Sequence, residues 1–196
     1  MEHRPKNEVS SADGKALSLS TTRMPVGVRY FFDGVRGREL SALLALRHLG
    51  LASGGDVVSW SVDALAADLD TPSLRMLAGL SNKPNEFEVD GYLRDFGTEV
   101  ARELPDRASL LDFYPRFIAE RMVQGRLPPF DGAKTLYRFY LASGSFAAVS
   151  TWTALDDDAE LATTGVYGTV PEVEQKILAA AAALLQRYRW SAPGGA

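Results

Sequence analysis

Apolar residues recur every three or four positions along most of the chain, which is the spacing of amphipathic helices. Alternation typical of β-strands is almost absent. The spacing predicts helices over residues 38–52, 56–69 and 72–78, and further helices that begin near residues 85, 112, 131, 152 and 169. We therefore expect an all-α fold, a single compact bundle of about seven or eight helices with short loops.

Three of these helix starts carry a local capping signal. Thr71 precedes a proline, which suits the first helical position because that amide has no partner within the helix. Asn85 and Thr169 each stand three residues before a glutamate, as in a capping box. These side chains are expected to accept hydrogen bonds from the free amides of the first turn.

Proline and glycine set further boundaries inside the helical region. Pro115 should stop a helix that runs through it, so we expect a helix that starts at Asp112. Gly91 and Gly97 lie in one predicted helix and suggest that another backbone packs closely there. The run SGS at 143–145 is expected to separate two helices.

The ends of the chain differ from its middle. Residues 1–24 are polar and without periodicity, so we expect a mobile arm there. Residues 25–190 are expected to form one helical domain, and residues 191–196 a tail. Within the domain, the apolar segment 26–32 fits either a short strand or an ordered lead-in to the first helix.

Charge and composition exclude several classes of function. The net charge is -4, and basic residues are mixed with acidic ones, which argues against a nucleic-acid partner. No segment approaches the roughly 20 apolar residues that cross a bilayer, so we expect no membrane association. The polar leader lacks the apolar region of a secretory signal, and the chain has no cysteine. We expect a cytoplasmic protein.

Catalytic chemistry finds little support in the residue types present. His48 lies on the apolar side of its predicted helix, and with Ser53, Ser59 or Asp56 nearby a catalytic triad can be drawn. A partly buried, hydrogen-bonded core histidine is the favoured interpretation. The sequence GAKT at 132–135 resembles the end of a phosphate-binding loop, but Ala133 stands where the second glycine is needed. We expect no cofactor and assign no catalytic residue.

A run of carboxylates offers a weak metal site at Asp156, Asp158 and Glu160. It is not an EF-hand, because Leu161 occupies the required glycine position and Tyr167 occupies that of the closing glutamate. An acidic, solvated helix start is the favoured interpretation.

Arg75 lies in a short helix that we expect to be held between longer ones. If Arg75 is partly buried it needs a carboxylate, and Glu86, Glu88 and Asp90 are the candidates. The alternative is that Arg75 binds an anionic ligand or a carboxylate of a partner protein.

Aromatic residues provide the remaining binding candidates. Trp60 and Trp152 could anchor an interface, although core packing is favoured for both. Tyr167 lies in the Gly- and Thr-rich loop ATTGVYGT, and loops of this kind often carry function. A further aromatic cluster could form either a core or a ligand pocket between helices: Phe113, Tyr114, Phe117, Phe130, Tyr137, Phe139 and Tyr140.

The segment DTPSLRMLAGLSNKPNEFEVDGYLRDFGTE, residues 70–99, resembles part of small helical bacterial proteins, chiefly from actinobacteria. The resemblance implies a conventional single-domain protein and no activity. From the residues themselves we expect an accessory or immunity-like module that binds another protein and is not an enzyme. The alternatives are a helical binder of a small ligand with an aromatic pocket and, less favoured, a carboxylate-based metal enzyme.

Overall fold

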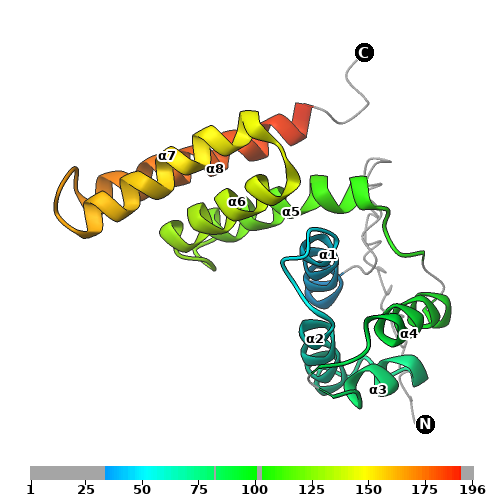
Figure 1. Ribbon diagram of the computed structural model, residues 1–196. Helices are drawn as coiled ribbons and strands as arrows, with labels where there is room; N and C mark the ends of the chain where they lie inside the picture. The colour runs from blue at the N-terminus through cyan, green and yellow to red at the C-terminus, as the bar shows by residue number, and fades with distance from the viewer. Residues whose placement is uncertain (1–33, 82, 101–102, 191–196) are drawn as a thin grey trace, which may run out of the picture.

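The computed structural model describes residues 34–81, 83–100 and 103–190, where the chain forms α-helices and no strand (Figure 1). The prediction of an all-α fold is confirmed. The expected arm 1–24, the segment 26–32 and the tail 191–196 lie outside the described residues. The helices are α1 (Val35–His48), α2 (Gly54–Ala66), α3 (Pro72–Ala78), α4 (Glu86–Glu99), α5 (Arg107–Val123), α6 (Pro129–Ser143), α7 (Phe146–Thr163) and α8 (Val170–Trp190).

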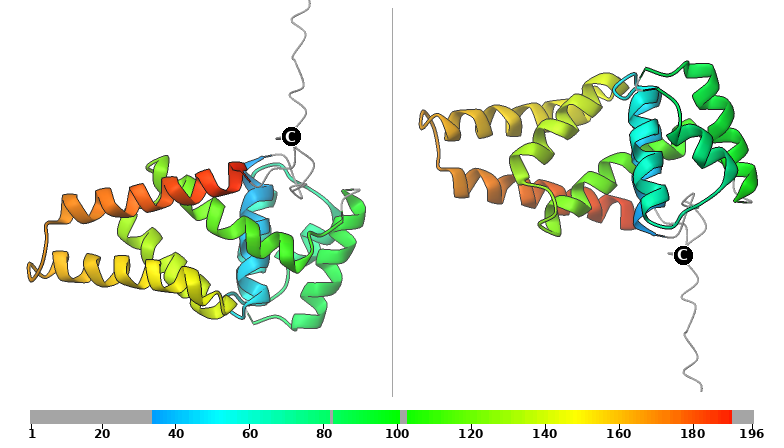
Figure 2. Two further views of the ribbon diagram at one scale, coloured as in Figure 1. Left: turned by 90° about the horizontal axis from the view of Figure 1, so that it is seen from above. Right: turned by 90° about the horizontal axis from the view of Figure 1, so that it is seen from below.

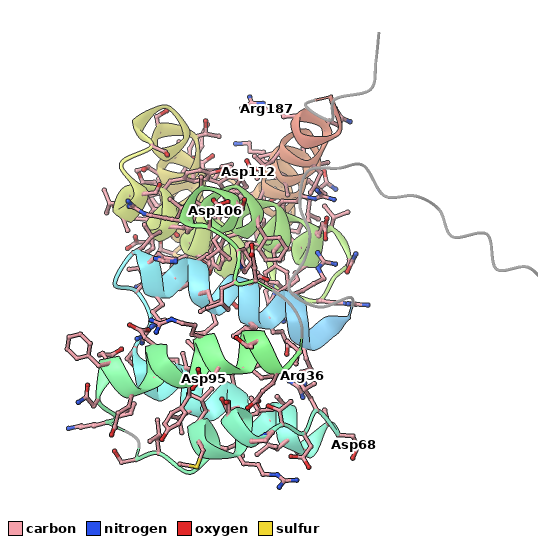
Figure 3. All side chains as sticks on the ribbon, turned by 90° about the vertical axis from the view of Figure 1, so that its right-hand side faces the viewer. Arg36, Asp68, Asp95, Asp106, Asp112 and Arg187 are labelled. Carbon is pink, nitrogen blue, oxygen red and sulfur yellow. The ribbon has the colours of Figure 1, made fainter. Side chains whose placement is uncertain are left out.

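The helices form two groups that meet at α1. Helices α2, α3 and α4 pack together at one end, and α5 to α8 pack together at the other. Helix α1 contacts both α2 and α5. Figure 3 shows α1 crossing between the groups, with Asp106 and Asp112 above it and Asp95 below. One continuous apolar core runs through both groups, so the helices form a single packed unit.

Helix starts follow the local signals of the sequence. Thr71 Oγ1 accepts a hydrogen bond from the amide of Leu74 at 3.3 Å, and Asn85 Oδ1 accepts one from the amide of Phe87 at 2.9 Å. The amide of Thr169 donates to Glu172 Oε2 at 3.1 Å. These three predicted starts are confirmed because each depends on groups within one turn of helix.

Helix α2 starts earlier than expected. Ser53, not Asp56, precedes its first residue, and the amide of Ser53 donates to Asp56 Oδ2 at 2.7 Å. Asp56 is therefore the third helical residue, where its carboxylate closes a capping box. Helix α1 likewise spans Val35–His48 instead of 38–52.

The expected start at Asp112 is wrong, because α5 runs through Pro115. Its first turn is capped by Asp106, whose Oδ1 accepts from the amide of Ser109 at 2.9 Å. Pro115 is buried, and burial of Phe113 and Ile118 on either side offsets the hydrogen bond that a proline cannot donate. The expected break at 143–145 is confirmed, with Gly144 in a left-handed conformation at φ 73°.

The close backbone approach expected at Gly91 and Gly97 is wrong at Gly91, whereas Gly97 is buried in α4. An added Cβ at Gly91 would meet nothing within 4 Å. A tight contact lies at Gly132 on α6, where an added Cβ would stand 2.5 Å from Cγ of Met122 on α5 and closer still to its Sδ. Gly132 therefore sets how closely α5 and α6 pack.

Helices α7 and α8 form a long hairpin. Both helices pack on the pair formed by α5 and α6: α7 contacts α6, and α8 contacts α5. The hairpin then extends beyond α5 and α6 and ends in the connecting loop, far from α2, α3 and α4 (Figure 2). We call this hairpin of α7 and α8 the arm, which is distinct from residues 1–24, and its residues 161–170 the arm tip.

Candidate functional site

Exposed apolar side chains gather at the arm tip. Val166 and Tyr167 are 71% and 63% exposed, and Leu161 and Val170 at the flanking helix ends are also exposed. The loop is ordered by its backbone, because the amides of Val166 and Tyr167 donate to the carbonyl of Leu161 at 2.9 and 3.3 Å. Gly165 supplies a left-handed conformation at φ 71°. The tip therefore presents two large side chains from a fixed turn.

The region around the arm tip is acidic. Between residues 139 and 175 the sequence contains six Asp and Glu residues and no Lys, Arg or His. The nearest cation along α8 is Lys176, whose Nζ pairs with Asp158 Oδ2 at 3.2 Å. Glu160 is exposed, and Glu172 is bound to its own helix cap. The apolar tip is thus surrounded by negative charge.

A second polar cluster joins α1, α2 and α4. The Arg47 side chain is 14% exposed and forms ion pairs with Glu86 and with Asp90, its Nη2 lying 2.7 Å from Asp90 Oδ1. Glu86 Oε1 also accepts from the amide of Gly54 at 3.0 Å. The Gly54 amide and then Arg47 hold the pKa of Glu86 below its usual range.

A cleft of about 570 Å³ opens beside this cluster. It lies between α1, α4 and the segment that leads into α5. Its floor is aliphatic, with Leu44, Leu93 and Leu110 from three different elements. Its rim is charged and includes His48 of α1 and Arg94 of α4. The cleft thus combines an apolar floor with cationic and polar groups at its edge.

A smaller cleft of about 230 Å³ lies at the contact between α1 and α5. The guanidinium groups of Arg38 and Arg121 stand 5.6 and 5.5 Å from the ring centroid of Phe117. Arg38 also pairs with Glu120, which accepts from Arg116 Nε at 3.0 Å. These contacts hold the two helices together, and we assign this cleft a structural role.

Arg75 lies in a different environment from the one expected. Its side chain is 65% exposed and pairs with Asp70, Nε to Oδ1 at 2.6 Å. The expected pairing with Glu86, Glu88 or Asp90 is wrong, because Arg47 of α1 reaches the first and last of these acids instead. Arg47 thus forms the ion pair with these two acids, which are themselves 55% and 56% exposed, and the pair joins α1 to α4 and not to α3.

Both candidate tryptophans are core residues. Trp60 and Trp152 are 7% and 3% exposed. The Trp60 ring packs edge-on to Phe96, with centroids 6.0 Å apart, and its buried Nε1 has no hydrogen-bond partner among the residues that the structure describes. Neither ring is available at the surface as an interface anchor. Tyr167 is the remaining aromatic candidate, and it is exposed at the arm tip.

The aromatic cluster is part of the core. Tyr114 stacks on Phe139 with centroids 4.7 Å apart, and Phe113 stacks on Phe117 at 5.5 Å. Burial raises the pKa of Tyr114 to about 12. Phe113, Tyr114, Phe117, Phe139 and Tyr140 are buried, so these rings pack between helices as core residues, and Phe130 and Tyr137 are partly buried against them.

The weak metal candidates point to different neighbours. Asp158 pairs with Lys176 of α8. Partial burial raises the pKa of Asp156, and the nearby charge of Lys134 on α6 opposes that shift. Within the described residues no group of three or more His, Cys, Asp and Glu could hold a metal ion. The acids lie in the middle of α7, not at a helix start as expected.

The triad considered around His48 is not assembled. His48 is exposed at the end of α1, contrary to the expected core position. Asp56 is bound by the amide and hydroxyl of Ser53 in the α2 cap. The GAKT segment lies inside α6, so its amides belong to the helix and do not form a phosphate-binding loop.

No helix in the described part of the chain is long and apolar enough to cross a membrane. Comparisons with protein-family models, with curated proteins and with solved structures find no match to this chain. The resemblance of residues 70–99 to actinobacterial proteins therefore stays a prediction.

The sequence indicated only some of the residues of the arm tip and of the cleft between α1 and α4. Val166 and Tyr167 could be suspected because large apolar residues are unusual in a short Gly- and Thr-rich turn. Arg47 and Arg94 gave no local signal, since the cleft exists only once α1 and α4 lie side by side. Periodicity assigns a face to each helix but does not say which faces meet.

Proposed function

We propose that this chain is a cytoplasmic protein-binding module, accessory or immunity-like and not an enzyme, that docks another protein through the arm tip. The observation that carries the proposal is the exposure of Val166 and Tyr167 on an ordered turn at the far end of the arm. Tyrosine is frequent among the residues that dominate binding energy. A turn that is already ordered loses little conformational freedom on docking.

The charge around the arm tip specifies the chemistry of the partner. The surrounding acids favour a surface on which an apolar pocket is bordered by Lys and Arg side chains. Such a border speeds encounter with an acidic tip and disfavours acidic proteins. We therefore expect the complex to weaken as salt concentration rises.

The proposal is tested by comparing what three immobilised proteins retain from a lysate of the source cells. The first is the wild type, and the second carries Val166→Ser with Tyr167→Ser. The third carries Phe87→Ser, a matched control because Phe87 is 87% exposed on α4, away from the arm. We expect one protein to be retained by the wild type and the control, lost from the tip variant, and eluted by salt.

The identity of the contact is then checked with a photo-reactive phenylalanine analogue at position 167. An adduct with the same protein is expected there and not with the analogue at position 87. Retention of that protein by the tip variant, or its equal loss from the control, would contradict docking through the arm tip.

A further inference from the structure

We propose that the cleft between α1, α4 and the start of α5 binds a small monocarboxylate with an apolar tail. The carboxylate is bound at the rim by Arg94 and His48, and the tail lies on the aliphatic floor. The site lies in the part of the molecule opposite to the arm tip, so it does not depend on docking there (Figure 1).

The pairing of charges at the rim leaves Arg94 for the ligand. Asp90 stands one turn before Arg94 on α4, where a pair within the helix would be possible. Asp90 instead pairs with Arg47 across the helices. In the described parts of the chain no carboxylate lies within ion-pair distance of Arg94 or of His48. Both residues line the cleft, Arg94 from α4 and His48 from the end of α1.

Arg47 determines the sign of the charge that the cleft accepts on a ligand. It occupies both acids of the rim, Glu86 and Asp90, so an ammonium group would have to displace it. A carboxylate needs no such exchange, because Arg94 offers an uncommitted fork of N–H donors. The two acids also disfavour a second negative charge on the ligand. The rim therefore favours a monocarboxylate over an amine or a dicarboxylate.

The aliphatic floor of the cleft favours an apolar tail on the ligand. Leu44, Leu93 and Leu110 are 6%, 2% and 1% exposed, so they form a firm apolar surface at the bottom of the cleft. Leu104 and Pro105 extend this surface toward α5. A cleft of about 570 Å³ is within the size range of small-molecule sites. An aliphatic chain of about eight carbons is a suitable probe, because most of it could be removed from water.

The test is isothermal titration calorimetry of the full chain with octanoate. Acetate carries the same head without the tail, and octan-1-ol carries the tail without the charge. We expect octanoate to bind and each of the other two to bind at least about tenfold more weakly. Absence of octanoate binding, or equal binding of octanoate and octan-1-ol, would overturn the proposal.

Variants then locate the binding. Arg94→Gln should weaken octanoate about tenfold and leave octan-1-ol unchanged, because only the head contacts that side chain. Arg138→Gln is the matched control, since Arg138 is also exposed in a helix but lies on α6. Ala52→Trp should block the cleft at its rim for both ligands.

Circular dichroism spectra and unfolding midpoints show whether these surface variants fold as the wild type does. Octanoate affinity that is unchanged in Arg94→Gln, or equally reduced in Arg138→Gln, would refute the assignment of the head group. Octanoate binding that survives Ala52→Trp would place the ligand elsewhere.

Discussion

Replacing Gly132 by alanine should destabilise the protein, although alanine is the better helix former. Gly132 lies in α6 against Met122 of α5, which is 2% exposed. A Cβ at position 132 would overlap the Met122 side chain, whose Cγ would be 2.5 Å away. The same substitution at Gly91 in α4 meets nothing within 4 Å, so it isolates the effect of helix propensity.

The two substitutions are expected to change stability in opposite directions. Alanine is favoured over glycine inside a helix by about 1 kcal/mol. An added methyl group in a packed core costs about 1–3 kcal/mol, and Met122 has no solvent-exposed space to move into. Gly132→Ala should therefore lower the free energy of unfolding by up to about 2 kcal/mol after the propensity gain. Gly91→Ala should raise it by up to about 1 kcal/mol.

The assay is urea unfolding followed by far-ultraviolet circular dichroism at fixed pH. For a chain of this size, each kcal/mol corresponds to a shift of about 2–4 °C in Tm, which gives an independent check. In the double variant Gly132→Ala with Met122→Ala the overlap disappears, so the combined loss should be smaller than the sum of the single losses by the overlap cost, about 1–3 kcal/mol. Additive losses, or a Gly132→Ala protein as stable as Gly91→Ala, would refute the packing argument.

Two further predictions concern charged residues. The Gly54 amide and then Arg47 lower the pKa of Glu86, so its contribution to stability is complete at neutral pH and is lost as pH falls through its usual titration range and below. Glu86→Gln should therefore lose less stability than the wild type between about pH 6 and about pH 3.5, measured by urea unfolding. Arg75→Ala should leave the unfolding midpoint unchanged, because its pair with Asp70 is exposed to solvent; a clear fall in Tm would contradict this.

The sequence predicted those features of the fold that depend on neighbours along the chain. Side-chain caps at Thr71, Asn85 and Thr169 each involve groups two or three residues apart. The break at Gly144 similarly depends on one residue in a left-handed conformation. Local chemistry decides such features, so tertiary packing does not change them.

Features that depend on tertiary contacts were predicted less well. Pro115 stays inside α5 because the surrounding core residues offset its missing hydrogen bond. Arg75 was expected to be enclosed, yet the short α3 leaves its outer face in solvent and its partner is Asp70 nearby in sequence. Two of the three acids proposed for it, Glu86 and Asp90, are paired with Arg47, which lies about forty residues before them. Residue type indicated that an ion pair was needed but not which arginine supplies it.

Gly132 shows both the local and the tertiary determinants of the fold. In the sequence it belonged to GAKT, a segment that resembles a phosphate-binding loop. In the fold its role is to let Met122 and the rest of α5 approach α6. A glycine signals that a backbone needs either unusual dihedral angles or close contact, and only the packing of α5 on α6 distinguishes the two. The cleft between α1, α4 and the start of α5 could not be predicted for the same reason, because its floor comes from three elements whose proximity no local pattern contains.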